Sequence, residues 1–219
     1  MSEHEPIVVY GRATSSNVQA VMWTLAELGL DCERLDYGHA HGGNDTPEYL
    51  AMNPTGLVPT LRHGDLVIWE SAAICRYLAA RFGPTPLWPE NPGARAPVDM
   101  WAEWGKTTLG PHFSMPIFWP VIRTPAAERD DAAVAAAIAR FDADLGVLEA
   151  KIGAGPWIMG ADLTLADVMA GTQLYRWFTM EIDRPARPGI EAYYARLCER
   201  PTYAEHVMVN YDSLRAAVG

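Results

Sequence analysis

Hydroxyl and amide side chains gather where a short apolar run gives way to a helical pattern. The run is IVVY at 7–10, and the polar residues that follow it are Thr14, Ser15, Ser16 and Asn17. A helix N-terminus favours an anion because its first N–H groups are unpaired and the helix dipole is positive there. A hydroxyl at that point can donate a hydrogen bond to a thiolate held nearby. Unlike a cysteine, it cannot take part in thiol–disulfide exchange. The alternative is that Ser15 or Ser16 only caps the helix.

A second polar pair, Glu70 and Ser71, opens another helical pattern. Ser71 is expected to be the N-cap of that helix. Its hydroxyl and the neighbouring N–H groups can also hold a carboxylate, while Glu70 receives an ammonium group. The α-amino acid end of a ligand carries both groups at close quarters, so the pair fits such a ligand.

The first 83 residues alternate strand and helix patterns in the order β-α-β-α-β-β-α. Helical spacing after residue 17, a Thr-Pro-Glu start at 46–48 and the pattern after Ser71 predict three helices. Apolar runs and alternation predict strands at 7–10, 32–37, 58–61 and 66–69. A strand, helix, strand order implies a parallel pair with a right-handed crossover.

The rest of the chain reads as almost wholly helical. Residues 84–92 are rich in proline and predict a linker between an α/β domain at 1–83 and a helical domain at 93–219. Thr164 and Asp167 fit a capping box, which we interpret as structural. Within the helical domain, helices are expected at 126–151, 164–177 and 190–199.

Pro59 stands at the head of the third expected strand, between Val58 and Thr60. Proline cannot donate to a strand ladder and is confined to edges, strand starts and bulges. The element order with a proline here resembles the thioredoxin-type arrangement, in which the X-Pro bond is cis. Such a bond turns the backbone of Val58 outward, where it can pair with an extended peptide ligand. The alternative is an ordinary proline at a strand start.

The composition argues against several classes of function. The 219 residues carry a net charge of −10 without a basic stripe, which disfavours binding to nucleic acid or to anionic membranes. Neither a signal peptide nor a membrane-spanning run is found, so we expect a cytoplasmic protein. Cys32, Cys75 and Cys198 are too scattered for a disulfide framework or a zinc site. His39 and His41 alone are weak evidence for a metal, and no metal is expected.

Several motifs carry a family likeness. NPTGLVPTL, WESAAICRYLA and GADLTLADVMAG resemble segments of the cytosolic glutathione transferase family, over essentially all of the chain. YGRATSSNVQAVMWTLAELGL further resembles bacterial members related to the serine-type phi and theta classes. The resemblance implies a thioredoxin-like α/β domain that binds glutathione and an all-α helical bundle that holds a hydrophobic electrophile. It also implies glutathione as cosubstrate, no metal, a homodimer and a role in detoxification.

The resemblance also implies roles for residues of the first domain. Ser15 would activate the glutathione thiol as a thiolate, with Asn17 as the runner-up. Glu70 and Ser71 would hold the γ-glutamyl end of glutathione.

The remaining contacts to glutathione are expected around the third strand. Val58 would pair with the cysteinyl backbone beside cis Pro59, and Asn44 would meet the glycyl carboxylate. Leu57 stands where relatives commonly have a polar or basic residue, which removes one contact to that carboxylate.

The electrophile side is expected in the helical domain, at Trp104, His112, Phe118 and Trp119. Lys106 looks unusual for the family and is expected to bear on the substrate side. The electrophile itself stays open, and conjugation, dehalogenation, ring opening and peroxide reduction are all compatible. The alternative function is a non-catalytic module of the same fold that binds ligands or serves assembly. A redox enzyme that transfers glutathionyl groups would need a cysteine near position 15, which the chain lacks.

Overall fold

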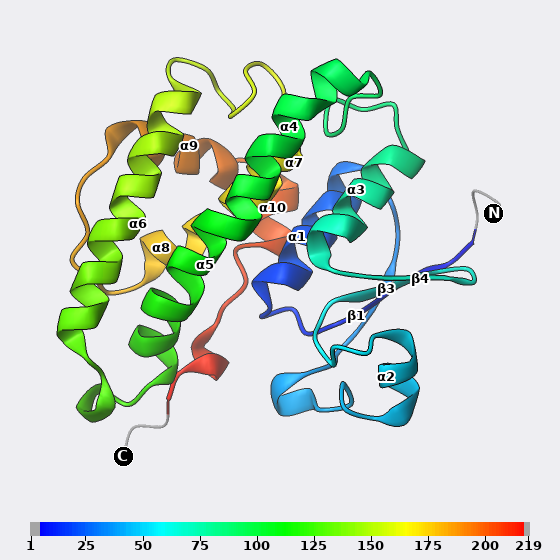
Figure 1. Ribbon diagram of the computed structural model, residues 1–219, viewed down its shortest axis with the longest axis horizontal. Coiled ribbons are helices and arrows are strands. Elements are labelled where there is room, and N and C mark those ends of the chain that lie inside the picture. Colours follow the sequence, from blue (N-terminus) through cyan, green and yellow to red (C-terminus); the bar gives the residue numbers. More distant parts are fainter. Residues whose placement is uncertain (1–4, 217–219) are drawn as a thin grey trace.

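Four short strands form one mixed sheet in the first part of the molecule. The computed structural model describes residues 5–216, and Figure 1 shows the sheet beside an array of helices. The strands pair in the order β2-β1-β3-β4, with β1 and β2 parallel and the other pairs antiparallel. Their bounds are β1 Ile7–Tyr10, β2 Glu33–Leu35, β3 Thr60–His63 and β4 Leu66–Trp69. The predicted thioredoxin-like order is confirmed.

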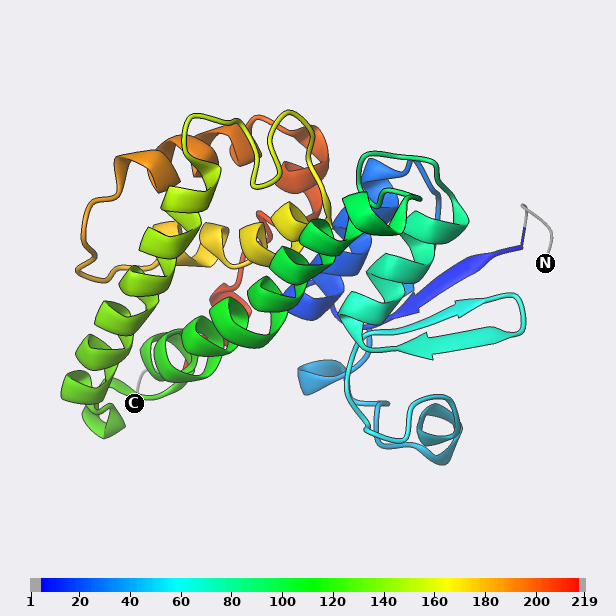
Figure 2. The ribbon, with the colours of Figure 1, turned by 45° about the horizontal axis from the view of Figure 1, so that its top comes forward.

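Helices cover both faces of this sheet. α1 and α3 pack together on one face and α2 lies on the other (Figure 2). Successive side chains of a strand point to opposite faces, so Ile7 and Val9 of β1 join the main core. Val8 and Tyr10 instead pack with Tyr49 of α2. The helix bounds are α1 Ser16–Glu27, α2 Pro47–Met52 and α3 Ser71–Arg81.

The helical part begins with one long segment from residue 92 to residue 123, coloured green in Figure 2. It consists of α4 Pro92–Trp104, a π-helical stretch η2 Gly105–Leu109, α5 Gly110–Phe113 and a second π-helical stretch η3 Ser114–Arg123. π-Helical turns are rare and often mark functional sites. A side chain at Gly105 would come within 3.1 Å of the Ala170 backbone nitrogen, so glycine allows the segment to approach α7 (Leu165–Gly171) closely.

Two expected helices differ from those observed. Residues 126–128 form a short 3₁₀ turn, η4, and α6 begins only after the N-cap Asp130, whose carboxylate accepts from the Ala133 N–H at 2.9 Å. The helix expected at 164–177 is two helices, because the Thr172 hydroxyl donates to the Val168 carbonyl at 2.5 Å, a contact that bends helices. The remaining helices are α6 Asp131–Ile152, α7 Leu165–Gly171, α8 Leu174–Thr179, α9 Pro188–Cys198 and α10 Pro201–His206, with 3₁₀ turns η1 His39–His41 and η5 Asp212–Leu214.

Asp167 lies at the centre of a buried hydrogen-bond network at the start of α7. Its carboxylate accepts from the Thr164 N–H at 2.8 Å and hydroxyl at 3.1 Å, which confirms the predicted capping box. It also accepts from the Ile158 N–H and the Tyr193 hydroxyl, each at 2.9 Å. Burial raises the pKa of Asp167 despite these donors. The network therefore ties α7, α9 and the preceding loop together.

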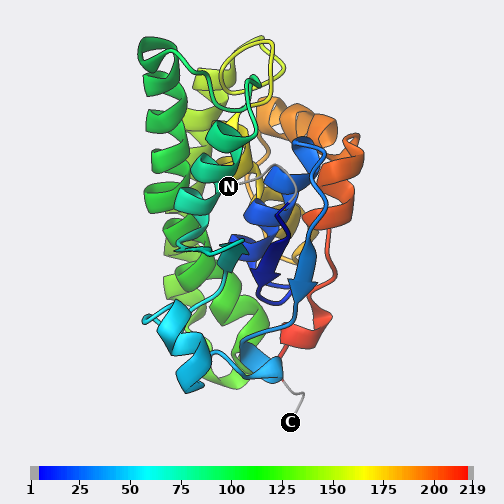
Figure 3. The same ribbon diagram turned by 90° about the vertical axis from the view of Figure 1, so that its right-hand side faces the viewer.

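The sheet part and the helical part share one core. Trp23 of α1 packs edge-to-face on Tyr203 of α10, with ring centroids 4.9 Å apart, and Figure 3 shows α10 running beside α1. At the end of the same helix, Glu27 accepts hydrogen bonds from Arg200 and Thr202. Within residues 5–216, no helix is both long and apolar enough to cross a membrane.

Candidate active site

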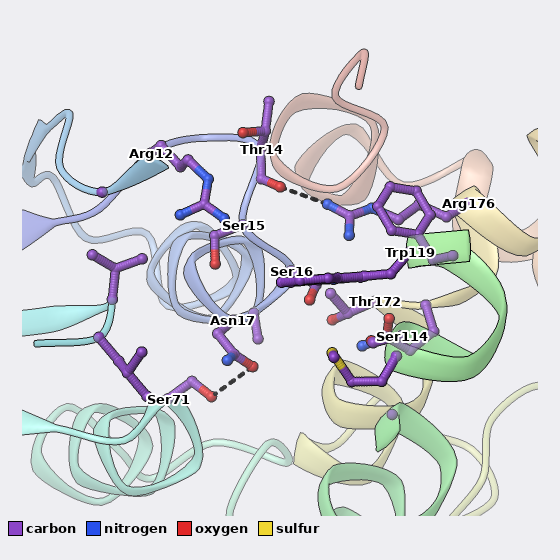
Figure 4. A pocket seen from close by; sticks show the side chains of 18 of the residues that line it. Arg12, Thr14, Ser15, Ser16, Asn17, Ser71, Ser114, Trp119, Thr172 and Arg176 are labelled. Carbon is purple, nitrogen blue, oxygen red and sulfur yellow. Dashed lines mark hydrogen bonds between the residues drawn. The ribbon is translucent and has the colours of Figure 1, made fainter. Parts of the chain in front are cut away.

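A cavity of about 550 Å³ lies between the two parts of the molecule. Figure 4 shows the loop before α1 on one side of it and the helical part on the other. The sheet side contributes residues 12–17, the segment 56–58 before β3, and Ser71. The helical side contributes side chains from 105–123 and 169–176. The cavity therefore has room for a ligand held by both parts.

Ser15 is the N-cap of α1, and its side chain lines the cavity. Its backbone is extended, with φ −90° and ψ 122°, and its carbonyl accepts the first helical hydrogen bond from the Gln19 N–H at 2.9 Å. Its hydroxyl makes no capping hydrogen bond, so capping alone does not explain a serine at this position. Figure 4 shows that hydroxyl pointing into the cavity. It is available as a donor at the positive end of the helix dipole.

The segment before β3 brings its backbone to the same cavity. The Val58-Pro59 peptide bond is cis, as the likeness to thioredoxin-type proteins implies, and Val58 lines the cavity. The carbonyl of Leu57 accepts from the Tyr49 hydroxyl at 2.6 Å and from the Asn53 amide at 2.8 Å. These two buried donors fix the segment against α2.

Lys106 enters the cavity from the helical part and meets the start of α3. Its ammonium donates to Asn17 Oδ1 at 2.8 Å and to Ser71 Oγ at 2.9 Å. Burial lowers the pKa of Lys106, and the carboxylate of Glu70 opposes that shift. The sequence placed Lys106 on the substrate side, whereas the structure places it against two residues expected to serve glutathione.

The start of α3 differs from the expected cap. Glu70, not Ser71, is the N-cap, and its φ of +72° is a left-handed conformation that non-glycine residues seldom adopt. Such conformations cluster at ligand-binding sites, although Glu70 itself is not among the residues that line the cavity. Ser71 is the first residue of the helix, 2 % exposed, and its hydroxyl also donates to Asn17 Oδ1 at 3.4 Å.

Asn44 reaches the cavity from the loop before α2. Its amide donates to the Gly56 carbonyl at 2.6 Å and so supports the segment that carries Val58. An amide nitrogen has two hydrogens, which leaves a second donor for a ligand.

The expected electrophile residues fall into two groups. Phe118 and Trp119 line the cavity. Trp104 and His112 are not among the lining residues, which corrects that part of the expectation. Trp104 turns to pack edge-to-face on Trp101, with centroids 5.3 Å apart, and His112 contacts Asp144 at 2.6 Å. Both lie on the same long segment as Phe118, but helical geometry points them elsewhere.

Three arginines that were not singled out from the sequence also line the cavity: Arg12, Arg123 and Arg176. Arg176 is 5 % exposed, donates to the Thr14 carbonyl at 2.6 Å and lies over the Phe118 ring at 4.4 Å. Burial lowers the pKa of Arg176 to about 10. Only the position of Arg12, three residues before Ser15, gave a signal that sequence reasoning could have used.

Both parts of this chain match domains of one known protein family. Residues 5–80 match the glutathione S-transferase N-terminal domain, and residues 131–196 match the glutathione S-transferase C-terminal domain. The chain is 38 % identical over 205 residues to glutathione S-transferase GstB of Escherichia coli, covering 93 % of this chain and 98 % of that protein. The chain belongs to the glutathione S-transferase family.

Other members of the family show the same similarity. Glutathione S-transferase 3 of Zea mays is 33 % identical to this chain, and the match covers 92 % of this chain and 93 % of the maize protein. The theta-class glutathione S-transferase of Xanthomonas axonopodis pv. citri, solved with glutathione bound, has a TM-score of 0.89 at 43 % identity and covers 94 % of this chain and 99 % of its own. The predicted family, two-part fold and transferase class are therefore confirmed.

Within the described part of this transferase, no group of three or more histidine, cysteine, aspartate or glutamate side chains could hold a metal ion. The domain boundaries predicted at 1–83 and 93–219 stay predictions, and so do the individual roles of the site residues.

Proposed function

We propose that this transferase binds glutathione in the cavity beside α1, ionises its thiol, and joins the sulfur to an electrophile held against the helical part. The observation that carries the proposal is the Ser15 hydroxyl, which is free of a capping bond at the start of α1 and points into the cavity. The glutathione-bound relative of the same fold supports glutathione as the cosubstrate.

Four residues would hold the peptide of glutathione. The backbone of Val58, beside cis Pro59, would pair with the cysteinyl residue as an added strand does. Glu70 would receive the γ-glutamyl ammonium, and Ser71 with its N–H groups would hold the adjacent carboxylate. Asn44 would offer its second amide hydrogen to the glycyl carboxylate.

Lys106 adds a positive charge to the γ-glutamyl end, because its ammonium lies 2.9 Å from the Ser71 hydroxyl. The same ammonium also donates a hydrogen bond to Asn17 Oδ1. Asn17 is thereby drawn to the γ-glutamyl side of the cavity, which supports Ser15 as the residue that meets the sulfur. We propose that Asn17 and Lys106 together position Ser71.

The energetic requirement on Ser15 is modest. A free thiol has a pKa of about 8.5, and lowering it by about two units needs roughly 2.7 kcal/mol. A hydrogen bond to a charged group contributes about 1.5–3 kcal/mol. The dipole of α1 adds about 0.3–1 kcal/mol. The guanidinium of Arg12, directed towards Ser15 in Figure 4, would further favour the anion.

The remaining family properties are proposed here on the resemblance alone. We propose a cytoplasmic homodimer that serves detoxification, in which peroxide reduction is a side activity.

The direct test of the proposed activity is the loss of glutathione thiol in the presence of a neutral aryl halide. We expect turnover that saturates in both reactants and exceeds the uncatalysed rate. A protein that binds glutathione but leaves the rate unchanged would instead be a binding module.

Replacing Lys106 is expected to weaken glutathione binding. Lys106→Met should raise the KM for glutathione about tenfold, or roughly 1.4 kcal/mol, because a charge next to the γ-glutamyl carboxylate is lost. The chain has one other lysine, Lys151 on α6, and Lys151→Met provides the control. Steady-state kinetics with varied glutathione would measure both. An unchanged KM in Lys106→Met would remove Lys106 from the glutathione site.

A further inference from the structure

Positive charge is concentrated in the cavity of a protein whose net charge is −10. Arg12, Arg123 and Arg176 are close enough to repel one another, since Arg123 contributes to lowering the pKa of each of the other two. The same repulsion reaches His39, which also lines the cavity. Among residues 5–216, none of the three arginines forms an ion pair with a carboxylate. Uncompensated charge of one sign in a half-closed cavity is costly unless an anion enters it.

Buried polar atoms without partners lie on both sides of the cavity. Gln173 is 7 % exposed and lines the cavity, and its Oε1 has no hydrogen-bond partner among the described residues. The Nε of Arg12 is likewise buried and unpartnered within that part of the chain. Arg176 is over nine-tenths buried, and its hydrogen bond to the Thr14 carbonyl occupies only one of its nitrogens. A guanidinium has five N–H donors, so most of the donor capacity of Arg176 remains for a ligand.

Two of the arginines belong to the electrophile side of the cavity. Arg123 lies over the Trp119 ring at 4.0 Å and Arg176 over the Phe118 ring at 4.4 Å. Stacking on an aromatic ring fixes the plane of a guanidinium and leaves its edge free for an anion. Figure 4 shows Arg176 and Trp119 across the cavity from Ser71. The γ-glutamyl end of glutathione is thus expected at the opposite end of the cavity.

We propose that the second substrate of this transferase carries an anionic group, a carboxylate in the simplest case, and that Arg123 and Arg176 bind it while Phe118 and Trp119 cover its apolar body. This inference rests on the proposed function, because it assumes a glutathione thiolate at Ser15. In the reaction the sulfur forms a bond to an electrophilic carbon of that substrate. For a halide substrate, the carbon–halogen bond breaks and halide leaves with the bonding electrons.

The test compares three glutathione adducts that differ in one substituent. S-benzylglutathione, its 4-carboxy derivative and its 4-carbamoyl derivative would each be titrated into the protein by calorimetry. The carboxylate should bind about 10- to 100-fold more tightly than the carbamoyl compound, which has the same shape and no charge. In Arg123→Gln this ratio should fall by about tenfold or more. Arg129→Gln, which changes an arginine outside the cavity that pairs with Asp131, should retain the ratio.

Each outcome decides a separate point. A ratio near one in the wild-type protein would overturn the proposal of an anionic substrate, and a ratio retained in Arg123→Gln would overturn its assignment to Arg123. If Arg123 served glutathione itself, Arg123→Gln would weaken all three adducts equally, which would also contradict the proposal. If none of the three adducts bound, the proposed glutathione site itself would fail.

Discussion

Ser15→Ala is expected to lower kcat with a neutral electrophile by about 10- to 100-fold at neutral pH, and to change glutathione affinity by less than about threefold. The hydroxyl donates to the sulfur only once the sulfur is an anion, so its loss raises the thiol pKa more than it weakens binding of the peptide. The dipole of α1 and the charge of Arg12 remain in the variant, which limits the loss. The loss should shrink above the pKa of free glutathione, because the thiol then ionises without help.

The neighbouring hydroxyl provides the control for this experiment. Ser16 is the first residue of α1 and also lines the cavity, so Ser16→Ala removes a hydroxyl from the same turn of helix. Steady-state kinetics across pH would be measured for both variants, with glutathione affinity from calorimetry. A loss confined to Ser16→Ala, or equal losses in kcat and affinity for Ser15→Ala, would remove Ser15 from the thiolate site.

Asp167→Ala is expected to lower the free energy of unfolding by about 3 kcal/mol. Asp167 accepts hydrogen bonds from groups of Thr164, Ile158 and Tyr193, all buried with it. Removing the carboxylate leaves those donors without an acceptor, and each buried unsatisfied group costs about 1–3 kcal/mol. The new space can admit water, which keeps the total below the sum.

Replacing a second, exposed helix cap shows how much of the loss in unfolding free energy in Asp167→Ala comes from burial of its network. Asp130 caps α6 with a single 2.9 Å bond to the Ala133 N–H and is exposed, so Asp130→Ala should cost only about 0.5–1 kcal/mol. Urea unfolding of both variants at one protein concentration would compare them. Equal losses would show that Asp167 acts as an ordinary cap and that its network adds nothing.

The sheet part was readable from the sequence because its signals are local. IVVY, the turn around Gly64 and the proline before Thr60 each mark one element within a few residues. All four expected strands are present, but β3 begins at Thr60, two residues later than expected, and β2 is shorter than the expected 32–37. The capping box at Thr164 is equally local. The break between α7 and α8 was missed because it depends on one Thr172 side chain that bonds back to its own helix.

The two sides of the cavity also differ in how well the sequence predicts their residues. The side proposed for glutathione is built from short contiguous motifs around Ser15, Val58 and Ser71, so sequence alone nominated it. The side proposed for the electrophile draws on the long segment and on α8, and which faces of these helices point into the cavity depends on packing between helices. Trp104 and His112 were therefore misplaced, and Arg123 and Arg176 were overlooked.

Lys106 shows that contacts between residues far apart in the sequence also limit what can be predicted from sequence. Its type and its position in the long segment were noticed, but its partners Asn17 and Ser71 lie 89 and 35 residues away in sequence. Only the packing of the long segment against α1 and α3 brings them together. The contacts of Lys106 with Asn17 and Ser71 could therefore not be predicted from sequence patterns.

The central claim is that the cavity beside α1 turns the glutathione thiol into a thiolate. It is tested most directly by the ultraviolet thiolate absorbance of protein-bound glutathione against pH, with S-methylglutathione as the blank. We predict ionisation about two pKa units below the free value of about 8.5. Binding with an unshifted pKa would contradict the claim and indicate a non-catalytic module, and absence of binding would contradict the glutathione site as a whole.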